Sequence, residues 1–169
     1  RVYSEDEVEF TTFLKSYDEV FVATGNNDIR ENKITMLKTM DITIGTLIHP
    51  RALISPTAKV LAGTIVLANA VVNTNATVGM GCIINTATII EHDCIIEDFV
   101  NISPNTAIAG HTKIGQKTFI GVGTAIIDDI VVGKEVIIGA GSSVISNIPE
   151  YTTVVGVPAK VIKVHKNHK

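Results

Sequence analysis

Hydrophobic residues recur with a period of six along most of the chain. From position 48 to position 144, every sixth residue is Ile or Val, which makes 17 consecutive matches. The 25 Ile and 20 Val among 169 residues would give only about 4.5 matches by chance. The matching residues are Ile48, Ile54, Val60, Val66, Val72, Val78, Ile84, Ile90, Ile96, Ile102, Ile108, Ile114, Ile120, Ile126, Val132, Ile138 and Val144. This period excludes an α-helix, whose apolar face repeats every 3.6 residues.

A second register lies four residues after each of these positions, and its members are mostly small. They are Ala52, Ala58, Thr64, Ala70, Ala76, Cys82, Thr88, Cys94, Val100, Thr106, Thr112, Thr118, Thr124, Ile130, Val136, Ser142 and Ile148. Turn-forming residues separate the two registers, as in Ser55-Pro56 and Gly79-Met80-Gly81. The pattern predicts short strands joined by tight corners, with one β-branched and one small residue facing inward per strand.

Three such strands would close one triangular coil of 18 residues. Residues 48–149 then hold nearly six coils, stacked about 4.8 Å apart by backbone hydrogen bonds. The predicted fold class is an all-β solenoid, a parallel β-helix of hexapeptide repeats whose aliphatic core is buried by stacking.

Residues 1–47 lack the six-residue period and predict a partial α/β domain. Residues 5–17 carry apolar side chains at helical spacing, and residues 18–25 have the pattern of a buried strand that ends in a turn at Gly25. A second helix is expected over residues 26–40 and a second strand over residues 42–47. Strand, glycine turn, helix and strand make one βαβ unit of a Rossmann-like domain. Residues 150–169 remain as a C-terminal tail.

Composition and charge argue against nucleic-acid binding and against insertion into a membrane. With a net charge of −3 and a pI of about 5.9, the chain has no basic excess to neutralise phosphates, so no nucleic-acid partner is expected. No stretch reaches the roughly 18 uncharged apolar residues of a membrane helix, so no membrane insertion is expected. Cys82 and Cys94 fall in the small inward register, which predicts buried thiols in a reducing compartment. We expect a cytoplasmic protein, although the sequence opens on Arg1 and not on Met.

Candidate chemistry lies at the corners, because the inward positions are needed for packing. His92 occupies the third position of its hexad, a corner, between Glu91 and Asp93. A carboxylate that accepts a hydrogen bond from one ring nitrogen fixes the tautomer and raises the basicity of the other nitrogen. His92 is therefore a candidate general base with Asp93, or less favourably Glu91, as its partner. A surface histidine in an acidic neighbourhood is the alternative interpretation.

Gly110 follows His92 by 18 residues and should stack one coil above it. A corner glycine leaves its backbone N–H accessible, and an accessible N–H beside a general base suits acyl transfer, in which a carbonyl oxygen gains negative charge. His111 is either a second polar group at this place or only a corner residue, and the second interpretation is favoured.

These motifs resemble the left-handed β-helix hexapeptide acyltransferases. The resemblance rests on the hexads, on Ile90-Glu91-His92-Asp93-Cys94, on Ala109-Gly110 and on Val155-Gly156-Val157-Pro158-Ala159-Lys160. Within this group the chain is similar to bacterial sugar acetyltransferases, which include sialic acid O-acetyltransferases and UDP-4-amino-sugar N-acetyltransferases. Residues 22–30 are similar to the end of their N-terminal nucleotide-sugar domain, whose opening strand and glycine-rich turn have no counterpart within residues 1–169.

The resemblance implies a homotrimer with acetyl-CoA as co-substrate, bound in a cleft between adjacent prisms, and no metal. It assigns catalysis to His92, with Asp93 as its acidic partner, and substrate binding to Gly25. The family's cofactor-binding positions match Asn101, Gly110, Val122, Ala140 and Lys160. Several relatives carry a second histidine where this chain has Asn101, and asparagine can hydrogen-bond but not exchange protons.

The expected function is transfer of an acetyl group from acetyl-CoA to an amino or hydroxyl group of a bacterial sugar or nucleotide sugar, as in polysaccharide biosynthesis. The acceptor would attack the thioester directly, with His92 as general base. One alternative is a zinc-dependent hydrolyase like the γ-class carbonic anhydrases, which needs three converging histidines. Apart from His49, a junction residue at the entry to the first coil, the coils hold only His92 and His111. The other alternative is a non-catalytic solenoid used for assembly.

Overall fold

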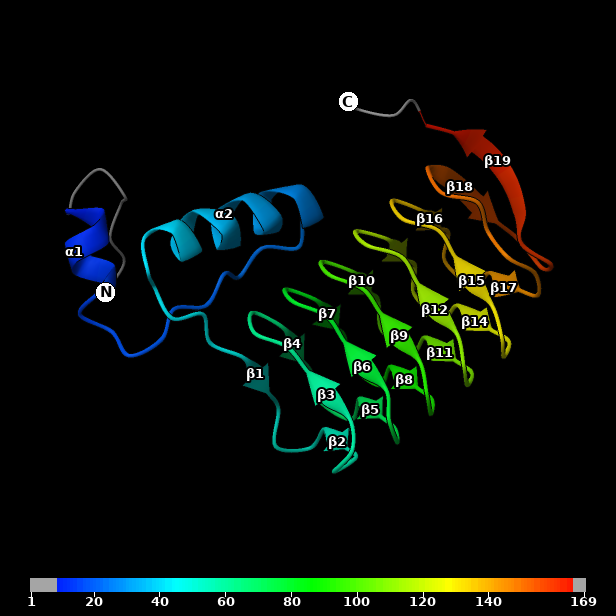
Figure 1. The fold of residues 1–169 in the computed structure, drawn as a ribbon. Helices are drawn as coiled ribbons and strands as arrows, with labels where there is room; N and C mark the ends of the chain where they lie inside the picture. The colour runs from blue at the N-terminus through cyan, green and yellow to red at the C-terminus, as the bar shows by residue number, and fades with distance from the viewer. Residues whose placement is uncertain (1–8, 166–169) are drawn as a thin grey trace.

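The computed structural model describes residues 9–165, which form two helices followed by a long stack of short strands (Figure 1). The helices are α1 (Phe10–Leu14) and α2 (Asn27–Thr39). The strands are β1 (Leu47–Ile48), β2 (Leu53–Ile54), β3 (Lys59–Val60), β4 (Ile65–Val66), β5 (Val71–Val72), β6 (Thr77–Val78), β7 (Ile83–Ile84), β8 (Ile89–Ile90), β9 (Ile95–Ile96), β10 (Asn101–Ile102), β11 (Ala107–Ile108), β12 (Lys113–Ile114), β13 (Phe119–Ile120), β14 (Ala125–Ile126), β15 (Val131–Val132), β16 (Ile137–Ile138), β17 (Ser143–Val144), β18 (Thr152–Val155) and β19 (Lys160–Val164).

Strands β1 to β17 confirm the predicted solenoid and its register. Each has two residues, the second is the predicted Ile or Val, and each pairs in parallel with the strand 18 residues away, as Ile102 does with Ile120. The strands form three sheets of eight, six and five strands, in the orders β1-β4-β7-β10-β13-β16-β18-β19, β17-β14-β11-β8-β5-β2 and β15-β12-β9-β6-β3. These are the three faces of a prism of about six turns.

The two inward registers form one continuous core. The Ile and Val column is buried from Val66 to Val144, and buried threonines lie beside it. Their hydroxyls donate to carbonyl oxygens 15 residues further along, as Thr64 does to Gly79 at 2.7 Å and Thr118 does to Gly133 at 2.9 Å. The hydroxyls are therefore paired inside the prism, where an unpaired polar group would be costly.

The two cysteines are core residues, as predicted. Both are free thiols with no exposed surface, and Cys94 donates from Sγ to the Ala109 carbonyl. Burial raises the pKa of the Cys82 thiol to about 12 and also raises that of Cys94. Neither thiol is a candidate nucleophile, because the reactive form is the thiolate.

The predicted Rossmann-like arrangement of the N-terminal segment is not observed. The strand expected over residues 18–25 is reduced to a single parallel bridge between Val20 and Ile44. The strand expected over residues 42–47 is also not formed, and the only strand residue in this range, Leu47, belongs to β1 of the solenoid. Two short segments without further partners do not make a stable sheet. The second helix is confirmed as α2, whereas α1 covers only part of residues 5–17, of which residues 5–8 lie outside the described part.

Helix α2 is fastened to the eight-stranded face by polar contacts. The buried Arg30 donates from Nε to the Gly81 carbonyl at 2.5 Å and from one terminal nitrogen to the Phe99 carbonyl at 3.0 Å. Lys117 forms ion pairs with Asp28 at 2.6 Å and with Glu31 at 3.1 Å. The helix therefore lies alongside the coils although it shares no strand with them (Figure 1).

The C-terminal segment closes the other end of the prism. Strand β18 pairs in parallel with β16, and β19 returns antiparallel to β18. His165 follows this hairpin, and its Nε2 lies 2.8 Å from the Thr153 hydroxyl. Among residues 9–165, no helix has the length and apolar character needed to cross a membrane.

Candidate active site

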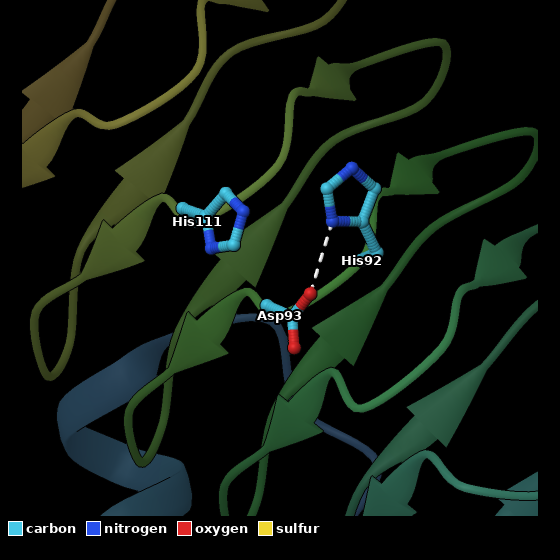
Figure 2. A group of neighbouring side chains, drawn as sticks. All are labelled: His92, Asp93 and His111. Atoms are coloured by element: carbon cyan, nitrogen blue, oxygen red, sulfur yellow. Dashed lines mark hydrogen bonds and ion pairs between the residues drawn. The ribbon is translucent and has the colours of Figure 1, made fainter.

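His92 and Asp93 form a hydrogen-bonded pair at the corner between β8 and β9, where the six-stranded sheet passes into the five-stranded sheet (Figure 2). The His92 Nδ1 atom lies 3.0 Å from Asp93 Oδ2, and the two side chains are 51% and 40% exposed. Hydrogen bonds from His92 and then from Asn75 hold the pKa of Asp93 below its ordinary value. An ionised carboxylate only accepts, so Nδ1 carries a proton, and in the neutral form of the ring the lone pair is on Nε2.

Asn75 is a site residue that sequence reasoning missed. Its Nδ2 donates to Asp93 Oδ1 at 3.1 Å, so both oxygens of the carboxylate are engaged, one by Asn75 and the other by His92. Asn75 precedes Asp93 by 18 residues. The same 18-residue spacing that relates His92 to Gly110 relates Asn75 to Asp93, so the sequence did contain a signal for Asn75.

Glu91 has a different partner. Its Oε2 accepts from Asn73 Nδ2 at 3.0 Å, again one coil earlier. The structure thus pairs His92 with Asp93 and not with Glu91, in agreement with the order of preference from the hexad position.

Gly110 lies directly against the His92 imidazole, as the 18-residue coil predicts. A Cβ atom at position 110 would be 2.7 Å from His92 Cε1 and 2.8 Å from Nε2, which is too close for real atoms. Side chains cap some equivalent corner amides, as Asp98 does for the Met80 N–H at 2.7 Å. The Gly110 N–H has no acceptor among residues 9–165. The residue that lies against the His92 ring therefore has a backbone N–H without a partner among the described residues.

His111 is part of the same corner. Its backbone N–H donates to the His92 carbonyl at 3.1 Å, and the two imidazole rings meet edge to face with centroids 5.1 Å apart. Figure 2 shows both rings and the Asp93 carboxylate gathered on one side of the coil. These contacts place the His111 side chain at the His92 corner, and no contact assigns it a role in acetyl transfer.

The remaining predicted site residues lie elsewhere on the chain. Asn101 is in β10 on the eight-stranded face, where its Nδ2 donates to the Gly25 carbonyl at 3.1 Å. Val122 and Ala140 are exposed and lie one coil apart at the corner between the eight- and six-stranded sheets. Lys160 is exposed at the start of β19. One chain alone therefore brings together His92, Asp93 and Gly110 at one corner and Asn101 and Gly25 on the eight-stranded face, while Val122, Ala140 and Lys160 lie apart from both groups.

A cavity of about 390 Å³ lies on the eight-stranded face, away from the His92 corner. Phe119 and Ile137 form an apolar part of its wall, and Asn27, Lys117 and Tyr151 contribute polar groups. The cavity lies between the first turn of α2 and the coils. Residues of the N-terminal segment form part of its wall, and it lies on the same face as Gly25 and Asn101.

Comparisons with known proteins identify relatives of the chain. No model of a known protein family matches it. A serine acetyltransferase of Buchnera aphidicola is 39% identical over 63 residues, which is 37% of this chain but only 24% of that enzyme. The GDP-perosamine N-acetyltransferase of Caulobacter crescentus, solved as a mutant with CoA and GDP-perosamine, is 30% identical with a TM-score of 0.88, over 90% of this chain and 74% of that one.

The chain belongs to the hexapeptide-repeat sugar acetyltransferases. A further solved member, the acetyltransferase domain of PglB from Neisseria gonorrhoeae with acetyl coenzyme A, is 37% identical, with a TM-score of 0.86 over 90% of this chain and 76% of that domain. The resemblance inferred from the hexads is thereby confirmed, together with the left-handed β-helix of this acyltransferase family. These sugar acetyltransferases match almost the whole described chain, whereas the serine acetyltransferase shares only part of the coils.

Proposed function

We propose that the protein transfers the acetyl group of acetyl-CoA to an amino group of a nucleotide-linked sugar, with His92 as the general base. The observation that carries this proposal is the His92–Asp93 pair at 3.0 Å, whose free ring nitrogen lies against Gly110. The acceptor class is supported by the Caulobacter crescentus relative, whose structure holds GDP-perosamine and CoA. A sugar hydroxyl, the other expectation from the sequence, has no such support among the sugar acetyltransferases, and the serine acetyltransferase matches only 37% of this chain.

His92 removes a proton from the acceptor nitrogen while that nitrogen attacks the acetyl carbonyl. The C–S bond of the thioester then breaks, and the CoA sulfur leaves and takes the proton back from His92. Nε2 is the accepting atom, because Nδ1 is already bonded to Asp93. As the ring takes up the proton it becomes positive, and the adjacent carboxylate stabilises that charge and keeps the ring oriented. Asn75 holds the second carboxylate oxygen and thereby fixes the position of Asp93.

Gly110 supplies the hydrogen bond that the reacting carbonyl needs. Its N–H has no acceptor among the described residues, and the missing Cβ leaves space for the acetyl group next to His92. The bound acetyl-CoA supplies the acetyl group as an activated thioester. A donor aimed at the oxygen that becomes negative lowers the barrier by several kcal/mol in other acyl-transfer enzymes, about 2.7–4 per donor. Both cysteines are buried with raised thiol pKa values, which supports direct attack without an acyl-enzyme.

We propose further that the complete site forms between chains of a homotrimer. Val122, Ala140 and Lys160 are assigned to cofactor binding, yet they lie on other parts of the prism than His92. A CoA molecule in a cleft between adjacent prisms would contact the His92 corner of one chain and these positions of its neighbour. Gly25 and Asn101 lie together on the eight-stranded face. We assign Gly25 to binding of the sugar acceptor and Asn101 to binding of the cofactor.

The test is an acetyl-CoA consumption screen over UDP- and GDP-linked 4-amino sugars, with sialic acid as the hydroxyl acceptor. Turnover is expected with an amino sugar nucleotide and not with sialic acid. His92→Ala should abolish most of it while the protein keeps its fold and binds CoA. Acetylation of sialic acid alone would reassign the acceptor to an oxygen atom, and no acetyl-CoA consumption with any acceptor would contradict the proposal.

A further inference from the structure

His92, Asp93 and His111 form a cluster of metal-ligand type that acetyl transfer does not fully use. Each offers one donor atom, and the three donor atoms all lie within 4.8 Å of one another. The proposed reaction employs His92 and Asp93, but it assigns nothing to the imidazole of His111. Figure 2 shows that the three side chains surround one space at the outside of the coil.

Coil stacking holds this arrangement in place. The His111 N–H donates to the His92 carbonyl at 3.1 Å, which fixes the backbone of His111 one coil above the His92–Asp93 corner. Asp93 and His111 both have left-handed backbone, with φ of 58° and 57°, so they occupy the same position in successive corners. Gly110 has no Cβ, and this absence leaves room for the His92 ring. The cluster is thus built on a rigid element and not on a loose loop.

The donor set suits a zinc ion. Two imidazoles and one carboxylate are common ligands of Zn²⁺ and related transition metals, with bonds of about 2.0–2.2 Å. Ligand atoms around tetrahedral zinc lie about 3.3 Å apart, so small rotations of exposed side chains suffice to reach that geometry. The His92 side chain is 51% exposed and that of Asp93 is 40% exposed, which leaves the fourth position open to water.

We propose that His92, Asp93 and His111 bind Zn²⁺ and that the bound ion inhibits the enzyme. The inhibitory half of this inference rests on the proposed role of His92 as base. An ion on Nε2 occupies the lone pair that would accept the substrate proton. An ion on Nδ1 shifts the ring proton to Nε2, which then has no lone pair to accept the substrate proton. Either mode stops proton removal.

The binding half is tested by titrating the metal-free protein with ZnCl₂ in a calorimeter. The wild type should take up one ion per chain, and His111→Asn should bind it at least about tenfold more weakly, because one of three ligands is gone. Asparagine is chosen because it tolerates the left-handed backbone at position 111. The matched control is His49→Gln, which removes a histidine at a corner of the first coil and should leave zinc affinity unchanged. Equal zinc affinity in His111→Asn and the wild type would overturn the site.

The inhibitory half is tested by turnover with and without ZnCl₂. Zinc should inhibit the wild type and a chelator should restore it, whereas His111→Asn should keep the zinc-free turnover of the wild type and resist zinc. Equal inhibition of both proteins, or zinc binding without inhibition, would overturn this half. Calorimetry needs no substrate, so a protein that binds zinc through His111 but acetylates nothing would contradict the proposed function and leave the metal site standing.

Discussion

The coils of residues 48–149 and the segment before them are stabilised in different ways. In the coils, each strand repeats the hydrogen bonds and the packing of the strand 18 residues earlier, so one local pattern determines the whole prism. The N-terminal segment has one parallel bridge to itself and is held on the coils by contacts that do not repeat, among them those of Arg30 and of the buried Ile34. Repetition makes a structure readable from its sequence, whereas unrepeated long-range contacts leave no such signal.

Ile102→Asp should break the coils and have the largest effect. Ile102 has no exposed surface, and an unpaired carboxylate inside the dry prism costs several kcal/mol. We expect no cooperative thermal transition by circular dichroism. The control is Leu53→Asp, at the outward position of β2, where the side chain is 65% exposed and the coils should still form. A wild-type melting curve for Ile102→Asp would show that the inward register is misassigned.

His92→Ala should lower kcat by roughly 10²–10⁴-fold, the usual contribution of a positioned general base. It should leave the melting temperature and CoA affinity close to those of the wild type, because His92 lies outside the core. Asp93→Asn should lose less, since the ring stays in place but is less basic. Steady-state kinetics with calorimetry of CoA binding measure both effects. Near-wild-type turnover of a folded His92→Ala protein would remove His92 from the mechanism.

Substitutions at Gly110 test whether coil stacking places the oxyanion donor. Gly110→Pro removes the N–H, which costs about 10²–10³-fold in kcat in comparable sites. Gly110→Ala keeps the N–H, but its Cβ would lie 2.7 Å from the His92 ring, so it should also slow turnover, by roughly 10²-fold if the ring moves by about 1 Å. Proline also has a Cβ at this place, so the loss of kcat beyond that of Gly110→Ala measures the missing donor alone. Full activity of Gly110→Pro would place the donor elsewhere.

Arg30→Met should loosen the N-terminal segment while the coils stay intact. The substitution leaves the Gly81 and Phe99 carbonyls without their guanidinium partner, at a cost of about 1–3 kcal/mol per unsatisfied buried group. Hydrogen exchange should speed up in α2 and stay slow in the inner strands. If exchange rises equally in both regions, the segment and the coils unfold as one unit and the contrast between them fails.

Asn75→Ala should have the smallest effect, about a two- to tenfold loss of kcat with little change in KM, from the loss of one hydrogen bond. Because Asn75 helps to hold the pKa of Asp93 low, its removal should move that pKa up toward the ordinary value. The ion pair with His92 would then be lost at a higher pH as the solution is acidified. An NMR titration of the Asp93 carboxyl group measures the shift, and an unchanged pKa would show that Asn75 does not position Asp93.

The sequence predicts nearly all of the solenoid and part of the site, for one physical reason. A coil of fixed length relates positions 18 residues apart, so Gly110 could be placed on His92, and Asp93 follows from adjacency. Arg30 could not be found in this way, because its partners Gly81 and Phe99 lie 51 and 69 residues away in no repeating relation.

The contacts of Arg30 are present but were not predicted, whereas the strand of residues 18–25 was predicted but is not formed. Its residues have good strand propensity, but propensity alone does not supply a neighbouring strand. His111 lies between these cases. The coil repeat places it one step above Asp93, yet nothing in the repeat says that its imidazole meets the ring of His92, which follows only from the side-chain conformations.

In strands β1 to β17, the parallel pairing with the strand 18 residues away also fixes distances along the prism axis. These distances change only in steps of one coil, about 4.8 Å, because a strand shifted by less would lose its hydrogen bonds and its place in the core. The distance along the prism between the His92 corner and the C-terminal hairpin of β18 and β19 is therefore set in steps of one coil. Insertion or deletion of an 18-residue block between them would change that spacing in one discrete step, while shorter changes have to be absorbed as loops at the corners.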